Sequence, residues 1–366
     1  RPDLVLAPYL TRAIPEDVCR AVRCLVVHPG PLGDRGPSAL DWAIREGRAR
    51  WGVTVLEASG EMDAGPVWAH RMFPMRAAAK SSLYRHELTE AAVAAVGEAL
   101  DRLAAGQGPA LPANTGPEGA KPAMRQADRA IDWAHEPTDL VLAKIRAADG
   151  QPGVRDRLGA CEAWLHDAHP APGRSGPPGA LIGRSGEAVL RATADGAVWL
   201  GALKVPLPGT DRTVKLPAAR ALGLVGHPLP PETDGADAPR RVTTERRGEV
   251  ALIRFPFLNG AMNIARCRAL EAAVREAAAG PAKAILLAGG EDFWSNGIDL
   301  ASIEAAESPA EASMETIQAM DDVCLAILEA RETWTVAAMR GNAGAGGVFM
   351  ALAADEVLAR EGTVLN

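Results

Sequence analysis

Two stretches rich in proline and glycine, residues 106–122 and 226–241, interrupt the chain and limit how far any single domain can extend. Such composition favours connections over helices or strands. Because 366 residues exceed what one hydrophobic core usually organises, two or three domains are expected. We therefore predict separate domains over residues 1–105, 120–225 and 242–366.

The first domain is predicted to be an open parallel α/β sheet. The apolar run at residues 24–28 is typical of a buried parallel strand, and residues 51–57 form the next predicted strand. Ser38, with Asp41 three residues later, resembles a capping box at the start of a helix. A second helix over residues 82–105 closes the domain. Its apolar face is predicted to contain Leu83, Leu88, Ala92, Val96, Leu100 and Leu103.

The other two domains have different patterns. One helix is predicted at residues 138–147, and the strand-like segments that follow favour a small β-rich, barrel-like accessory domain. The last domain returns to alternating strands and helices, from a strand at residues 250–255 to the apparent start of a strand at residues 363–366. Since the chain also lacks an initiating methionine, we expect the first domain to be truncated at its start and the last domain at its end.

Composition excludes several classes of protein. Hydrophobic residues make up 48% and charged residues 23%, which is typical of globular domains. No run approaches the roughly 20 apolar residues of a membrane span and no signal region follows the first residues, so we predict a cytoplasmic protein without membrane contact. A net charge of −7 without a basic run argues against a nucleic-acid partner. Five separated cysteines without a CxxC pair predict reduced thiols and no metal site.

The first candidate site centres on His28, which ends an apolar strand and precedes a loop rich in proline and glycine. Open α/β sheets bind ligands at such strand ends. A buried structural histidine would give the same residue, and for a histidine alone it is the better interpretation. The neighbouring motifs favour function. In chain order they are His28-Pro29-Gly30, Arg35-Gly36-Pro37-Ser38, Gly52-Val53-Thr54 and Met62-Asp63-Ala64-Gly65.

Together these motifs resemble the formyltransferases that use 10-formyltetrahydrofolate. Formyl transfer passes through a tetrahedral intermediate whose oxygen a positioned imidazole can stabilise, and the resemblance gives this role to His28. A nearby carboxylate can orient the imidazole and accept the proton of the nucleophile. Asp63 is the candidate, although Asp-Ala-Gly is also a common turn. The resemblance implies a folate site that includes Pro29, Gly30, Arg35 and Gly36.

One position departs from the formyltransferase pattern. The family usually has asparagine two residues before the histidine, where this chain has Val26. Valine cannot donate a side-chain hydrogen bond, so either catalysis is altered or the nucleophile differs. Residues 130–133 and 143–147 resemble the start of the family's smaller C-terminal β-barrel domain, in agreement with the accessory domain predicted above.

A second candidate site lies in the last domain. One strand leads into Asn296-Gly297-Ile298-Asp299-Leu300, and another runs into the glycine-rich turn of residues 340–347. This pair of segments resembles the enoyl-CoA hydratases, or crotonases. Two backbone N–H groups, by position those of Ile298 and Gly346, could stabilise the oxyanion of a CoA thioester. The implied binding residues are Asn296, Gly297 and Gly347.

The crotonase resemblance leaves alternatives open. The glycines are equally consistent with close packing where a strand meets a helix. Phe349 stands where hydratases place a catalytic glutamate, so ordinary hydration of a double bond is not expected. What remains is an oxyanion hole suited to another reaction of a CoA thioester.

The combination of the two modules resembles the HypX/HoxX family of hydrogenase maturation factors. This resemblance implies formyl transfer from 10-formyltetrahydrofolate to coenzyme A, and then release of carbon monoxide from formyl-CoA for the iron of nickel–iron hydrogenase. It also implies small-molecule substrates and contacts with hydrogenase maturation proteins. Two alternatives stay open: a formyltransferase acting on a sugar nucleotide or a charged tRNA, and a non-catalytic scaffold that binds folate or CoA. The acidic net charge disfavours tRNA.

Overall fold

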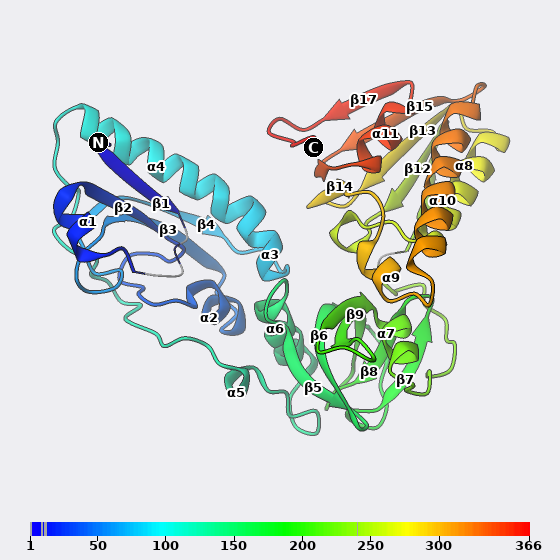
Figure 1. Cartoon of the computed structure of the whole chain (residues 1–366), viewed down its shortest axis with the longest axis horizontal. Coiled ribbons are helices and arrows are strands. Elements are labelled where there is room, and N and C mark those ends of the chain that lie inside the picture. Colours follow the sequence, from blue (N-terminus) through cyan, green and yellow to red (C-terminus); the bar gives the residue numbers. More distant parts are fainter. Residues whose placement is uncertain (1, 9, 11–12, 240) are drawn as a thin grey trace.

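The structure is a computed structural model that describes residues 2–8, 10, 13–239 and 241–366. Figure 1 shows three regions in chain order: a blue-to-cyan α/β region, a green β-rich region and a yellow-to-red α/β region. Hydrogen bonds join the first region both to the middle region and to the last one. Within the described residues, no helix combines the length and the apolar character needed to cross a membrane.

The first region contains the predicted open sheet, but the sheet is mixed and only partly parallel. Its strands lie in the order β1 (Leu4–Pro8), β2 (Arg23–His28), β3 (Arg50–Glu57) and β4 (Val67–Pro74). Only β1 and β2 are parallel, whereas β3 runs antiparallel to both of its neighbours. The helix before β3, α2 (Ala39–Arg45), spans about 10 Å, and β2 is about 20 Å long. The chain reverses direction between β2 and β3, with α2 in the connection.

A continuous helical segment packs on this sheet. It consists of α3 (Lys80–Leu83), the π-helical turn η1 (Tyr84–Leu88) and α4 (Thr89–Ala104). Leu88 and Ala92 are buried as predicted, but Leu100 is exposed, and Ala95 and Ala99 complete the buried face. The predicted helix is therefore present, with a face that is turned slightly from the predicted one.

The predicted capping box before α2 is wrong. Ser38 is the N-cap residue, but its hydroxyl makes no cap hydrogen bond and instead accepts one from Met124 N at 3.0 Å. The carboxylate of Asp41 forms ion pairs with Lys80 and Arg129. Both side chains therefore serve tertiary contacts that a local pattern does not reveal.

The green region is an open antiparallel sheet, and the prediction of a barrel-like domain is wrong. Its elements are α5 (Gln126–Arg129), α6 (Thr138–Ala148), β5 (Val154–Leu158), β6 (Cys161–Pro170), β7 (Leu181–Ser185), β8 (Ala188–Ala192), β9 (Ala197–Pro206), β10 (Thr213–Pro217) and α7 (Ala218–Leu224). The strand order is β5-β6-β9-β8-β7, with β10 beside β9. Val141 and Ile145 of α6 join the core around Leu165 and Leu200. Because a helix buries this face, the sheet does not need to close on itself.

The last region is a largely parallel sheet. Its strands, in spatial order, are β11 (Thr243–Arg247), β12 (Val250–Phe255), β13 (Ala284–Gly289), β15 (Trp334–Met339) and β17 (Glu356–Ala359). Only β11 is antiparallel to its neighbour. A small second sheet pairs β14 (Phe293–Ser295) with β16 (Asn342–Ala343). The helical segments still to be named are α1 (Glu16–Ala21), η2 (Leu258–Gly260), α8 (Ile264–Ala279), α9 (Leu300–Glu304), α10 (Pro309–Glu329) and α11 (Gly346–Leu352).

Candidate functional site

His28 lies at the carboxyl end of β2 between two carboxylates. Its side chain is 3% exposed, with Nε2 2.8 Å from Asp34 Oδ2 and Nδ1 3.3 Å from Asp63 Oδ2. A neutral imidazole carries one N–H and can donate to only one of these carboxylates. The structure thus brings the predicted pair His28 and Asp63 into contact and adds Asp34 as a third ionisable group.

Sequence reasoning misses Asp34. The residue is fully buried, and its Oδ1 has no hydrogen-bond partner among the described residues. Its contact with His28 explains the glycine at position 30, because a Cβ atom there would lie 2.3 Å from Asp34 Oδ2 and 2.5 Å from His28 Nε2. The only signal in the sequence is an aspartate in the loop after the histidine, and an exposed loop aspartate would give the same pattern.

Asn114, in a segment that has the composition of a linker, is a second residue that sequence reasoning misses. Its side chain is 4% exposed and connects the two loops that carry the carboxylates. Its Oδ1 accepts a hydrogen bond from Gly33 N at 2.8 Å. Its Nδ2 donates to the backbone oxygens of Asp34 at 3.1 Å and Asp63 at 2.8 Å. Asn114 therefore fixes the distance between the loops on either side of His28.

Asp63 both makes a turn and faces the histidine. Its φ of 53° lies in the left-handed region, which aspartate tolerates better than most residues. Its Oδ2 accepts a hydrogen bond from Gly36 N at 3.1 Å and also lies beside His28 Nδ1. The turn interpretation and the functional interpretation are therefore compatible, because the turn aims the carboxylate.

The other predicted residues of this site shape it mainly through their backbones. Trp51 Nε1 donates to Pro29 O at 2.9 Å, and Thr54 Oγ1 donates to Gly30 O at 2.8 Å. The side chain of Arg35 pairs with Glu61 at the surface and not with the His28 cluster. Gly36 contributes its N–H to Asp63, so of the predicted folate residues it is the one tied directly to the cluster.

Replacing Asn114 with alanine is expected to lower the free energy of unfolding by about 2–4 kcal/mol, because three hydrogen bonds are lost and their buried partners are left unpaired. Urea titration of the wild type and the variant measures this change. Gln107→Ala is the control, since Gln107 is exposed and makes no side-chain hydrogen bond to a described residue. Equal free energies of unfolding of the two variants would contradict the role of Asn114 in connecting the two loops.

The second candidate site lies just after the ends of β14 and β16, in the segments that contain Ile298 and Gly346. Met262 N donates to Gly297 O and Asp299 N donates to Met262 O, both at 2.9 Å, which leaves Ile298 N directed away from this bridge. A Cβ atom at Gly297, whose φ is 77°, would lie 3.2 Å from Gly346 N. No described group accepts a hydrogen bond from Ile298 N or Gly346 N. The two predicted donors therefore belong to adjoining segments and keep free N–H groups.

The remaining predicted residues of this site hold or pack against the segments that carry the two donors. Asn296 Nδ2 donates to Asn259 O at 2.8 Å and so anchors the segment before Ile298. A Cβ atom at Gly347 would lie 2.1 Å from Ser295 O, so glycine is required there by close packing, as the alternative interpretation held. Phe349 is 71% exposed. The glycines thus serve packing and leave the Gly346 N–H accessible.

An interdomain cavity of about 290 Å³ is bounded by all three regions. Burial lowers the pKa of the Arg146 guanidinium, and the charge of Asp139 opposes this effect. Neither Arg146 nor Lys215 forms an ion pair with a described carboxylate. Sequence reasoning misses the cavity because its walls come from distant parts of the chain. Its lining includes Ser82, Arg85, Arg146, Lys215, Asn259 and Asp292.

Three family models match successive parts of the chain. Residues 1–100 match formyl transferase, and residues 123–210 match the formyl transferase C-terminal domain. Residues 247–364 match enoyl-CoA hydratase/isomerase. The predicted resemblance to formyltransferases and to crotonases is therefore confirmed.

Known proteins also resemble the chain over its whole length. It is 53% identical to the hydrogenase maturation factor HoxX of Bradyrhizobium diazoefficiens, with 100% of this chain and 64% of HoxX aligned. The crystal structure of HypX from Aquifex aeolicus in complex with tetrahydrofolic acid matches with a TM-score of 0.92 and 46% identity, over 100% of this chain and 65% of that one. A methionyl-tRNA formyltransferase of Roseiflexus castenholzii is 31% identical over 54% of this chain and 65% of its own length. The chain thus spans just under two thirds of these relatives.

Proposed function

This chain belongs to the family of the hydrogenase maturation factors HoxX and HypX, and from that premise we propose that it converts a formyl group into carbon monoxide. The formyl group of 10-formyltetrahydrofolate passes to coenzyme A in the formyltransferase-type part, and formyl-CoA releases carbon monoxide in the crotonase-type part. Carbon monoxide then becomes a ligand of the iron in nickel–iron hydrogenase. The observation that carries the proposal is His28 held between Asp34 and Asp63 at a strand end.

The His28 cluster suits the formyl transfer step. The CoA sulfur attacks the formyl carbon, so that a C–S bond forms and the bond from this carbon to folate N10 breaks. Asp63, at 13% exposure the most open of the three groups, accepts the thiol proton. With Nε2–H donated to Asp34, the imidazolium form of His28 carries a second N–H at Nδ1, which faces this open side and stabilises the tetrahedral oxyanion. N10 takes up this proton from Asp63 as it leaves, which gives tetrahydrofolate and formyl-CoA.

Val26 favours a thiol over an amine as the acceptor. Val26 and His28 are two residues apart in β2 and so lie on the same face of the sheet. An apolar side chain therefore stands where the formyltransferases usually carry an amide donor. At neutral pH a thiol is partly ionised to a strongly nucleophilic thiolate, whereas an amine is mostly protonated. A thiol acceptor therefore depends less on an amide donor at this position. The attached crotonase-type domain is also explained only when the acceptor is CoA.

The crotonase-type domain suits the second step. Formyl-CoA loses its formyl hydrogen as a proton and its sulfur as the leaving thiolate, which leaves carbon monoxide without any oxidant or reductant. The N–H groups of Ile298 and Gly346 polarise the thioester carbonyl. Phe349 replaces the glutamate of hydratases, in agreement with a reaction other than hydration.

Coenzyme A is proposed to occupy the interdomain cavity in part. A molecule that receives the formyl group at one site and releases carbon monoxide at the other must reach both, and this cavity adjoins both domains. Arg85, Arg146 and Lys215 supply positive charge for its phosphates. The proposal places the protein in the cytoplasm, with hydrogenase maturation proteins as its partners.

The test uses the full-length parent protein with 10-formyltetrahydrofolate, in the presence and absence of CoA. Carbon monoxide is followed by the shift of a haem absorbance band in a reporter globin. Carbon monoxide that depends on CoA supports the two-step reaction. Consumption of the formyl donor without carbon monoxide reduces the function to formyl transfer, and no consumption favours a scaffold that binds folate or CoA.

A further inference from the structure

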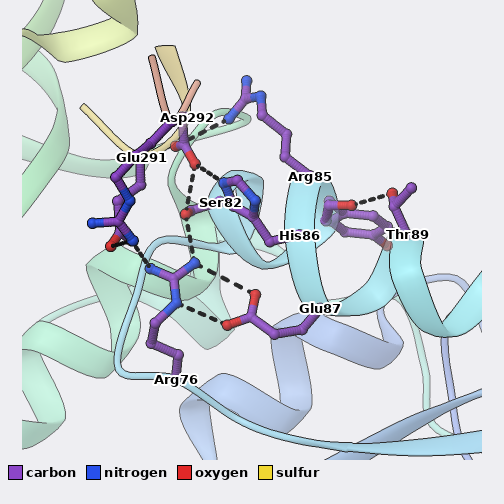
Figure 2. Close-up of polar contacts among 10 residues, drawn as sticks. Arg76, Ser82, Arg85, His86, Glu87, Thr89, Glu291 and Asp292 are labelled. Atoms are coloured by element: carbon purple, nitrogen blue, oxygen red, sulfur yellow. Dashed lines mark hydrogen bonds and ion pairs between the residues drawn. The ribbon is translucent and has the colours of Figure 1, made fainter. Parts of the chain in front are cut away.

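Asp292, in the loop between β13 and β14, receives hydrogen bonds from another domain. Ser82 Oγ donates to Asp292 Oδ1 at 2.8 Å, and His86 Nε2 lies 2.9 Å from the same oxygen. Arg85 Nη1 lies 3.5 Å from Asp292 Oδ2. Figure 2 shows these three side chains converging on Asp292 from the helical segment that begins at α3. The formyltransferase-type domain thus holds a carboxylate of the crotonase-type domain.

The contact is partly shielded from solvent. His86 is 14% exposed and Asp292 is 27% exposed, while Ser82 is buried. Arg76 lies beside them, donating from Nη2 to Ser82 Oγ at 2.9 Å and from Nη1 to Glu291 at 3.1 Å. Hydrogen bonds to a charged group in such a setting are stronger than those at an open surface. The Asp292 contact is therefore a better candidate for energetic coupling than an exposed ion pair.

The π-helical turn η1 carries the side chains that contact the loop of Asp292 directly or through Arg76. Arg85, His86 and Glu87 are consecutive residues of η1, and π-helical turns occur often at functional positions. Arg85 lies over the Phe293 ring at 4.7 Å, and Glu87 binds Arg76 at 2.8 Å. The three side chains therefore all serve the interface around the loop that contains Asp292.

The loop that contains Asp292 leads directly to both candidate oxyanion donors. Its next residue, Phe293, begins β14, which ends three residues before Ile298. Asp292 O accepts a hydrogen bond from Asn342 N at 3.3 Å, at the start of β16. Further along, Gly344 N donates to Ser295 O at 2.9 Å, two residues before Gly346. The loop that contains Asp292 therefore fixes the starts of β14 and β16, and each of these strands leads to one of the two donors.

The packing between these strands leaves little freedom for the loop to move alone. A Cβ atom at Gly341 would lie 2.4 Å from Phe293 N and 2.7 Å from Glu291 O. Backbones in such close contact shift together, because tightly packed interiors transmit displacement. A change at Asp292 therefore reaches β14 and β16 at the same time.

From these contacts we infer that Asp292 is a positioning residue through which His86 and Ser82 of the formyltransferase-type domain align the oxyanion donors of the crotonase-type domain. The inference rests on the proposed function of Ile298 and Gly346. It makes the second reaction step sensitive to a residue of the first domain that touches neither substrate. His86 is the informative residue, because it is not part of the cavity lining and contacts the loop that leads to the donors through Asp292.

The test compares His86→Ala with wild type in the full-length parent protein, with synthetic formyl-CoA supplied directly. The turnover number for carbon monoxide release is expected to fall about 10- to 100-fold, since small misplacements of catalytic groups cost this much. KM for formyl-CoA and the rate of formyl transfer to CoA should stay within about threefold of wild type, because no binding group is removed. His86→Gln, whose amide nitrogen can replace Nε2, should restore most of the activity.

The matched control is Arg340→Ala. Arg340 is 68% exposed and, among the described residues, forms an ion pair only with Glu291, so its loss should leave both steps unchanged. A reduced formyl transfer rate in His86→Ala equal to the loss of carbon monoxide release would overturn the inference, because it would indicate general damage. An unchanged release rate would overturn it as well.

Hydrogen exchange separates this inference from the proposed function. In His86→Ala, the hydrogen-bonded amides among residues 293–297 and 342–345 should exchange at least about tenfold faster, because the loop has lost an anchor. This measurement needs no activity. If wild type releases no carbon monoxide, the proposed reaction is wrong and exchange alone decides the coupling. Unchanged exchange in both segments would overturn the positioning role of Asp292.

Discussion

Formyl transfer is expected to fall at least about 10³-fold when His28 is replaced by alanine in the full-length parent protein. Loss of a positioned acid or base costs about 10²- to 10⁴-fold, and loss of an oxyanion donor costs about 10²- to 10³-fold. The loss of His28 affects both, since its Nδ1 edge stabilises the oxyanion and also lies beside Asp63, the proposed base. The measurement is tetrahydrofolate formed from 10-formyltetrahydrofolate in the presence of CoA.

The control for this prediction is an exposed histidine with the same type of partner. His135 is 82% exposed and lies 2.8 Å from Asp132, so His135→Ala should transfer formyl groups like wild type. Because His28 is buried, the thermal unfolding of His28→Ala and of the more polar His28→Asn is measured alongside. A folded His28 variant that keeps more than about a tenth of the wild-type rate would contradict the role of His28.

Supplying formyl-CoA bypasses the first step and sharpens the interpretation. The His28→Ala variant should still release carbon monoxide from added formyl-CoA, because the second site lies in another domain. If the His28→Ala variant binds folate like wild type, and wild type itself shows no turnover, the alternative of a non-catalytic scaffold gains support. Loss of both steps would indicate that the substitution disturbs more than the His28 cluster.

The parts of the fold that sequence predicts are those set by local pattern. The strand ending at His28, the long helix after β4 and the alternation of the last domain follow from runs of apolar residues and their spacing. Strand direction does not, because a short apolar run looks the same in a parallel and an antiparallel strand. The reversal at β3 appears only in the pairing of β2 with β3, and the open middle sheet depends on how α6 covers it.

The candidate sites show the same limit. His28 and Asp63 are predictable because their motifs follow in a set order, and the structure brings them together. Asn114 is not, because its surroundings have linker composition and its burial arises only when residues far apart in sequence meet. The contact between His86 and Asp292 joins residues 206 positions apart and has no local signature at all.

Asp34 carries the second large expected effect. In Asp34→Asn, formyl transfer should fall about 10²- to 10⁴-fold, because an amide can donate to His28 Nε2 where the carboxylate can only accept. Nε2 would then accept a hydrogen bond and carry no proton, so the imidazole would stay neutral and would lose the positive charge that stabilises the oxyanion. Asp34 is fully buried behind His28 and acts through it, so it is a positioning residue. The turnover number should therefore fall while KM for the folate changes less than about threefold.

Comparison with two other carboxylates shows whether the effect of Asp34→Asn comes from its contact with the His28 imidazole or from the loss of any negative charge. Asp132→Asn removes the partner of the exposed His135 and should change nothing, since that pair has no role in the site. Asp63→Asn should also lower turnover, but as the loss of a group that faces the substrate. The geometry behind this prediction is specific: Asp34 Oδ2 lies 2.8 Å from His28 Nε2, and Gly30 leaves room for no other side chain between them. If Asp34→Asn instead raised KM and kept the turnover number, Asp34 would shape the folate pocket and would not orient the imidazole.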